Sequence, residues 1–143
     1  MKTIAFNVLA LFAGLFIGSL VNIGLVTLGP HVIENPVGVD MSDVDKMRES
    51  MKLLQPANFI FPFLAHALGT LAGAAIAART AASHPMIFAA SIALVFLAGG
   101  ITMVVSVGGP SWFVLPDLLL AYIPMGILGG YLALPRVSSI PKE

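Results

Sequence analysis

The sequence predicts an all-α membrane protein, a bundle of four transmembrane helices with a short amphipathic helix in the first external loop. Three observations support this fold class. Hydrophobic residues make up 58% of the 143-residue chain and charged residues only 10%, and the mean hydropathy is +0.98. Four long segments are almost free of charged side chains, and each is long enough to cross a hydrocarbon core about 30 Å thick. Four such spans with short connections use up the chain, so we expect a single domain over residues 1–143.

The composition also excludes several classes of function. There is no cysteine, which rules out disulfide frameworks, thiolate metal sites, iron–sulfur clusters and cysteine nucleophiles. Seven basic and seven acidic residues balance, and no basic run is dense enough to bind phosphates, so we expect no nucleic-acid partner. No nucleophile elbow and no glycine-rich phosphate loop is present, and an enzymatic function is therefore less favoured than a non-enzymatic one.

The first predicted span covers residues 4–28. A cleaved signal peptide is the alternative, but the apolar run is longer than a signal-peptide core and lacks a small-x-small cleavage region, which favours a retained helix. Gly14, Gly18 and Asn22 recur at four-residue spacing and so share one face. Glycines allow close approach of a neighbouring backbone, and we expect this face to meet the second span.

The first loop should begin where Gly29 and Pro30 end the first span. A short amphipathic helix is then predicted over residues 42–55, with Ser42 and Asp45 spaced like a capping box. One apolar stripe and one charged face alternate along this segment. The helix should lie at the membrane surface or cover the mouth of the bundle. The stripe consists of Val44, Met47, Met51 and Leu54.

The second predicted span, residues 56–79, carries a ladder of small residues with one histidine beside it. The ladder repeats every four residues and should pack against another helix. An imidazole facing lipid would leave its hydrogen bonds unmet, so we expect His66 to point into the bundle. The ladder consists of Ala65, Gly69, Gly73 and Ala77.

The third and fourth spans are predicted over residues 86–108 and 112–134. The third span is plainly apolar, and nothing in it suggests chemistry. The fourth span can start at Trp112, or only after Pro116 if that proline is not tolerated inside the helix. Pro124 should kink it.

The distribution of lysine and arginine predicts that both termini face the cytoplasm, with the first loop outside. Lys46, Arg48 and Lys52 in the first loop weigh against this orientation. We expect the membrane to be a bacterial inner (plasma) membrane. The residues that favour the orientation are Lys2, Arg79, Arg136 and Lys142.

Three polar side chains fall at overlapping depths in this topology. Asn22, His66 and Asp117 could line one polar pocket that opens outward, with Thr70 as its floor and Glu34 at its rim. Polar and ionisable groups inside spans are functional candidates because burying them must be compensated.

Each residue also has a purely structural interpretation. Asn22 could only join two helices by a hydrogen bond. His66 could be a satisfied packing residue, and Asp117 could be the N-cap of a fourth helix that starts late. Glu34 could be a solvated loop carboxylate.

The leading functional hypothesis is a non-enzymatic membrane protein that binds or conducts a small solute through the pocket around His66. Small-residue faces on three spans suggest a homo-oligomer or a subunit of a membrane assembly. One alternative is an intramembrane metal-binding protein or enzyme using His66 and Asp117, and another is a purely structural accessory subunit. The sequence identifies no cofactor.

Overall fold

The computed structural model describes residues 2–134, and this part of the chain is helical without a β-strand. Four helical segments are long and apolar enough to cross a membrane, which confirms the predicted fold class. The last of them is divided into two helices. The elements are α1 (Lys2–Val32), α2 (Val44–Ser50), the 3-10 helix η1 (Pro56–Phe59), α3 (Ile60–Thr80), α4 (Pro85–Val107), α5 (Ser111–Leu120) and α6 (Ile123–Ala133).

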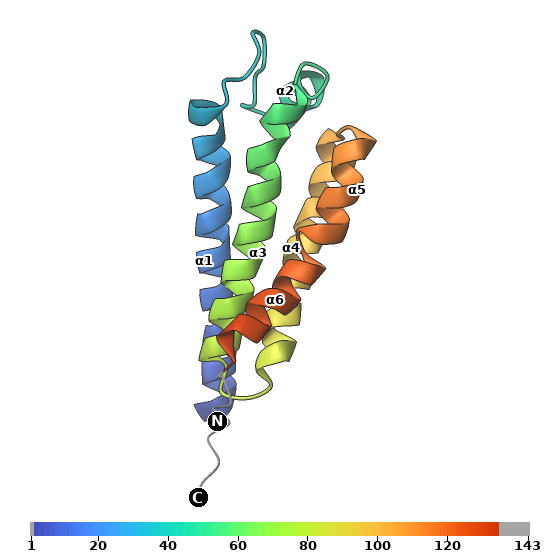
Figure 1. The fold of residues 1–143 in the computed structure, drawn as a ribbon. Helices are drawn as coiled ribbons and strands as arrows, with labels where there is room; N and C mark the ends of the chain where they lie inside the picture. The colour runs from blue at the N-terminus through green and yellow to red at the C-terminus, as the bar shows by residue number, and fades with distance from the viewer. Residues whose placement is uncertain (1, 135–143) are drawn as a thin grey trace, which may run out of the picture.

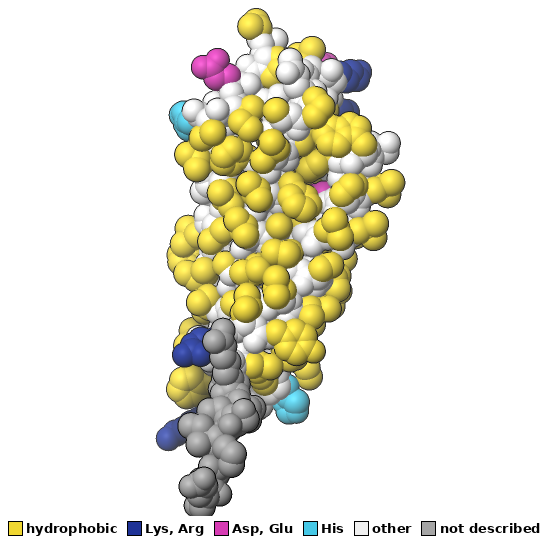
Figure 2. Space-filling model, in the orientation of Figure 1, with side chains coloured by type: hydrophobic (Ala, Val, Ile, Leu, Met, Phe, Trp, Pro, Cys, Tyr) yellow, Lys and Arg dark blue, Asp and Glu magenta, His cyan; other side chains and the backbone are white. Residues whose placement is uncertain are grey.

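The long helices run along one common axis, and α2 lies at the end opposite the start of α1 (Figure 1). Hydrophobic side chains cover the middle of the visible face, whereas most charged side chains gather near its two ends (Figure 2). This distribution is typical of a protein whose flank faces acyl chains. The chain is therefore an integral membrane protein by the composition and length of its helices. Its orientation stays a prediction, and Arg136 and Lys142 lie outside the described residues.

Glycines bring α1 and α3 into backbone contact. A Cβ atom added to Gly14 would lie 2.7 Å from the carbonyl oxygen of Gly73, and one added to Gly18 would lie 2.7 Å from that of Gly69. Real Cβ atoms do not approach so closely, so larger residues would push the two helices apart. The predicted contact between the first and second spans is confirmed, and all four residues of the ladder on α3 are buried.

The glycines of α6 serve the same purpose on the other side of α3. A Cβ atom added to Gly129 would collide with the backbone carbonyl of Leu71, and one added to Gly130 would lie 2.8 Å from the Cβ of Ala89 on α4. The small-residue faces that suggested self-association are thus used within one chain. Association with a second copy stays a prediction.

Two predicted helix ends differ from the structure. The first span does not stop at Gly29 and Pro30, because α1 continues to Val32 with Pro30 in its last turn. Gly29 is buried against Phe61 of α3, a contact that favours continued helix. The N-cap of α2 is Asp43, whose side chain accepts from the backbone N–H of Lys46, and not Ser42; the helix ends at Ser50.

The fourth span begins early and breaks in the middle. Its helix α5 starts at Ser111, so the late start after Pro116 is wrong. Phe59 packs against Trp112 and Phe113, with ring centroids 5.3 and 4.7 Å away, and these contacts stabilise the first turn. The predicted kink is present as a break in the helix after Leu120. Pro124 has no backbone N–H, so the carbonyl of Leu120, four residues earlier, has no helical hydrogen-bond donor.

Candidate functional site

A hydrogen-bonded pair joins α3 to α5 inside the bundle. Nδ1 of His66 lies 2.9 Å from both carboxylate oxygens of Asp117. The side chain of His66 is 22% exposed and that of Asp117 only 3%. An ionised carboxylate only accepts hydrogen bonds, so the pair with a charged Asp117 requires a ring that carries its proton on Nδ1. His66 thus points into the bundle, and Asp117 lies within α5 instead of capping a later helix.

Tyr122 completes the pair. Its ring stacks on His66 with centroids 5.5 Å apart and an angle of 28° between the planes. Its hydroxyl donates a long hydrogen bond of 3.4 Å to Asp117. The absence of a side chain at Gly100 makes room, because a Cβ there would lie 2.7 Å from Cζ of Tyr122. The imidazole is thereby held both at its edge and on its face.

Thr70 lies one turn beyond His66 but does not form the floor of a pocket. Its hydroxyl donates to the backbone carbonyl of His66 at 2.7 Å, and the residue is fully buried. It is absent from the walls of both cavities described below. Its visible contribution is to the packing of α3.

The first cavity, of about 250 Å³, lies beneath α2. We call it the methionine cavity, because Met41, Met47, Met51 and Met103 are in its wall. His66 and Asp117 provide its ionisable groups, and Asn35 and Asn58 add amides. Most of the remaining wall is aliphatic or aromatic. The remaining lining residues are Val26, Gly29, Pro30, Ile33, Leu54, Phe59, Phe61, Pro62, Gly100, Val104, Val107, Gly108, Phe113 and Val114.

Helix α2 and the residues that follow it cover this cavity, one of the two positions expected for the amphipathic segment. Three of the four stripe residues, Met47, Met51 and Leu54, line the cavity, whereas Val44 is exposed. Arg48 fixes the helix to α4, because its Nε donates to the carbonyl of Ser106 at 3.1 Å and a second nitrogen donates to the same oxygen. This contact places a positive charge at the C-terminal end of α4, where the helix dipole favours it.

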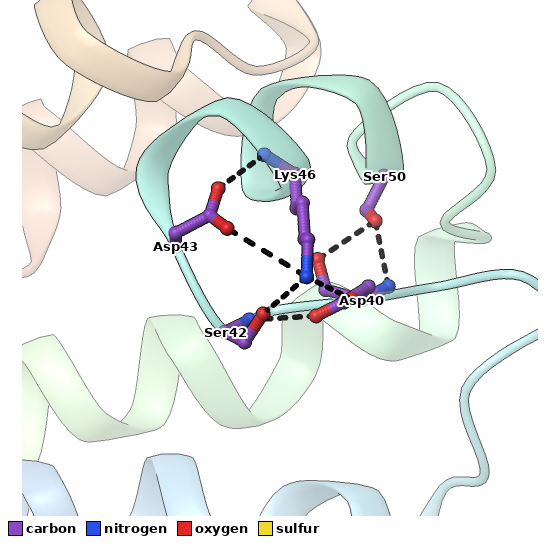
Figure 3. A network of polar contacts seen from close by, with 5 residues as sticks. All are labelled: Asp40, Ser42, Asp43, Lys46 and Ser50. Atoms are coloured by element: carbon purple, nitrogen blue, oxygen red, sulfur yellow. Dashed lines mark hydrogen bonds and ion pairs between the residues drawn. The ribbon is translucent and has the colours of Figure 1, made fainter.

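A network of polar contacts holds the loop before α2 (Figure 3). The buried hydroxyl of Ser50 accepts from the backbone N–H of Asp40 at 2.8 Å and donates to its carbonyl at 3.0 Å. Lys46 pairs with the Asp40 carboxylate at 2.9 Å. Hydrogen bonding from the side chain of Ser42, followed by that from Lys46, lowers the pKa of Asp40 from 3.8 to about 2.

The second cavity, of about 410 Å³, lies between α1 and α4. We call it the lateral groove, because Ile23, Val95 and Met103 in its wall are about half exposed on the apolar flank. It shares His66, Gly100 and Met103 with the methionine cavity. The other lining residues are Ser19, Asn22, Phe96, Gly99 and Tyr122. The ring of His66 therefore borders both spaces.

The structure unites the predicted site residues only in part. His66 contacts Asp117 in the methionine cavity, and it borders the lateral groove together with Asn22. Asn22 makes no side-chain hydrogen bond within residues 2–134, so it does not join helices in that way. Glu34 is exposed and lines neither cavity; its backbone carbonyl accepts a hydrogen bond from Asn58.

The sequence analysis did not identify Tyr122 or Ser19, and it did not predict that residues of α4 line both cavities. Tyr122 follows Asp117 by five residues, about 140° around a regular helix, so only the break after Leu120 brings the two side chains together. The neighbouring Pro124 was the signal for that break. Ser19 shares a face with Asn22 at i, i+3 spacing, which the sequence does contain.

The metal-binding alternative finds no support in the arrangement. Within residues 2–134 there is no group of three or more histidine, aspartate or glutamate side chains placed to hold a metal ion. His66 and Asp117 face each other, and Glu34 does not join them.

No protein-family model, curated protein or solved structure matches this chain. The function is therefore inferred from the geometry of the site.

The loss of stability in the His66→Ala, Asp117→Ala double variant should be smaller than the sum of the losses in the two single variants. His66→Ala leaves the buried carboxylate with only the long hydrogen bond from Tyr122, and breaking such a buried pair costs about 3–5 kcal/mol. In the double variant with Asp117→Ala the unpaired charge is gone, so the free energies of unfolding in micelles should differ from additivity by about 0.5–3 kcal/mol. His31→Ala at the exposed end of α1 serves as the control. Strict additivity would show that the pair does not interact.

Lys46 should contribute to the low pKa of Asp40, after the larger contribution of Ser42. Because its pKa is lowered when folded, the network stabilises the fold above about pH 4 and is lost as the pH falls through about 2. Lys46→Met should raise the pKa of Asp40 toward 3.8 without reaching it, since Ser42 still binds the carboxylate. Carboxyl ¹³C shifts measure this pKa, with Lys52→Met as the control. An unchanged pKa in Lys46→Met would mean that the contact does not form.

Proposed function

We propose that this membrane protein binds a small, mainly apolar solute that carries one hydrogen-bonding group, and that His66 receives that group. The observation that carries this proposal is the state of the imidazole. Nδ1 is engaged by Asp117, while Nε2 has no hydrogen-bond partner among the described residues. No fully buried side-chain nitrogen or oxygen in that part of the chain lacks a partner, so Nε2 is not fully buried, and His66 lines both cavities.

The pair is suited to presenting Nε2 to a ligand. Asp117 fixes the ring orientation, and Tyr122 packs on its face, so little rotational freedom remains to be lost on binding. A neutral ring with its proton on Nδ1 accepts a hydrogen bond at Nε2, and a protonated ring donates one there. The site therefore suits a hydroxyl group, which both donates and accepts.

The methionine cavity supplies the apolar part of the proposed site. Its volume of about 250 Å³ admits only a small molecule, near the lower end of the usual range for ligand pockets. Methionine side chains adjust their shape easily and so tolerate differences among apolar ligands. If the predicted orientation holds, the cavity opens toward the outside of the cell, beneath α2.

The alternative functions have less support. A metal centre lacks a third ligand within residues 2–134. A purely structural subunit would use its polar groups as contacts between helices, but Nε2 of His66 and the amide of Asn22 remain unpaired beside cavities. Conduction of the solute and assembly with other subunits are proposals that depend on binding.

Binding of 1-naphthol, compared with naphthalene, tests the proposal directly. The two molecules differ by one hydroxyl group. In lipid nanodiscs, after subtraction of partitioning into protein-free discs, 1-naphthol should bind saturably and its Kd should rise at least tenfold in His66→Ala. Naphthalene should bind more weakly and respond little to the substitution, and His31→Ala should leave both unchanged.

A second measurement keeps the test valid if His66→Ala folds poorly. The chain contains three histidines, so the ring ¹⁵N signals of the wild-type protein are few enough to assign. Saturating 1-naphthol should shift the Nε2 signal of His66 and leave His31 and His84 unmoved. Absence of saturable binding, or binding that leaves His66 unaffected, would overturn the proposed function.

A further inference from the structure

We infer that the lateral groove is a binding site for the polar head of a lipid-soluble molecule, which reaches His66 from the bilayer. This inference rests on the proposed function and specifies its ligand class. It starts from the position of the groove, whose rim is formed by exposed apolar side chains of α1 and α4. In a membrane this flank faces acyl chains, so a ligand dissolved in the bilayer reaches the groove directly from the lipid.

Three polar side chains converge on this apolar opening without partners. Ser19 and Asn22 lie three residues apart on one face of α1, and neither side chain makes a hydrogen bond within residues 2–134. Nε2 of His66 is likewise free. Because no fully buried side-chain nitrogen or oxygen there is unsatisfied, these groups are accessible from the space they line. Residues that bear a hydroxyl, an amide and an imidazole therefore line one groove.

Such groups are costly at this depth unless something binds them. His66 lies ten residues after the start of its span at Pro56, about 15 Å along the helix, and Asn22 lies six residues before the end of the predicted first span at residue 28, about 9 Å along α1. Unpaired amides and imidazoles in hydrocarbon lose the hydrogen bonds they make in water. An occupant that both donates and accepts hydrogen bonds would satisfy them.

The depth also restricts what that occupant is. Phospholipid headgroups lie outside the hydrocarbon core, whereas both residues belong to apolar spans, so a bound phospholipid would meet them mainly with its acyl chains. A free molecule with a compact hydroxyl or carbonyl head and an apolar body meets both the polar groups and the apolar rim. The ligand class is thus an aryl alcohol, a quinol or a comparable lipid-soluble compound.

The groove leads to the site already described. His66, Gly100 and Met103 belong to the walls of both cavities. A ligand whose head binds between Asn22 and His66 is therefore in contact with the same imidazole that borders the methionine cavity. The polar head of one ligand molecule can therefore bind in the lateral groove and contact the imidazole that Asp117 holds.

Two glycines provide a matched pair of substitutions. A Cβ atom added to Gly99, in the wall of the groove, or to Gly24, which lines neither cavity, meets nothing within 4 Å. Gly99→Leu should fill the groove without a backbone clash and raise the Kd for 1-naphthol in nanodiscs at least tenfold. Gly24→Leu should change it less than twofold. Asn22→Leu, which removes the amide, should weaken 1-naphthol at least fivefold and naphthalene less than twofold.

The outcomes separate this inference from the proposed function. If wild-type binding depends on His66 but Gly99→Leu and Asn22→Leu bind normally, the proposed function stands and the lateral groove is not the site. If the wild type shows no binding that depends on His66, the proposed function itself fails. Equal weakening by Gly24→Leu and Gly99→Leu would indicate a general effect on folding and would also contradict the inference.

Discussion

The hydrogen bond between His66 and Asp117 is the constraint on which the rest of the site depends. It joins the N-terminal half of α3 to α5 across an apolar interior, where an unpaired carboxylate would be strongly unfavourable. Satisfying that carboxylate uses one edge of the imidazole and fixes the ring. The opposite edge of the ring, which carries Nε2, is then held toward the space between the helices.

Close packing elsewhere creates that space. The glycines of α1 and α3 let these two helices meet at their backbones, and the glycines of α6 draw the fourth span against α3 and α4. Between α1 and α4 the helices lack such close backbone contact, and the lateral groove lies there. Helix α2 covers the methionine cavity at one end, held by Arg48 on the carbonyl of Ser106 and by Ser50 on the preceding loop.

Much of the fold followed from local sequence patterns. Four apolar spans, the glycine faces and the inward position of His66 depend on helical periodicity and on the cost of polar groups in lipid, both of which a sequence displays. The stacking of Tyr122 on His66 depends instead on how far the chain turns at the break before Pro124. The hydroxyl of Thr70 is instead bound to the carbonyl of His66, and Glu34 lies on the exposed loop, neither of which spacing alone reveals.

The most direct measurement is solid-state NMR of the His66 ring in lipid bilayers. We expect the proton to reside on Nδ1, as pairing with an ionised Asp117 demands. The oxygens 2.9 Å from that nitrogen also predict close ¹⁵N–¹³C proximity between Nδ1 and the carboxyl carbon of Asp117. A ring with an unprotonated Nδ1, or one without dipolar coupling to Asp117, would contradict the account, because nothing would then hold Nε2 toward a ligand.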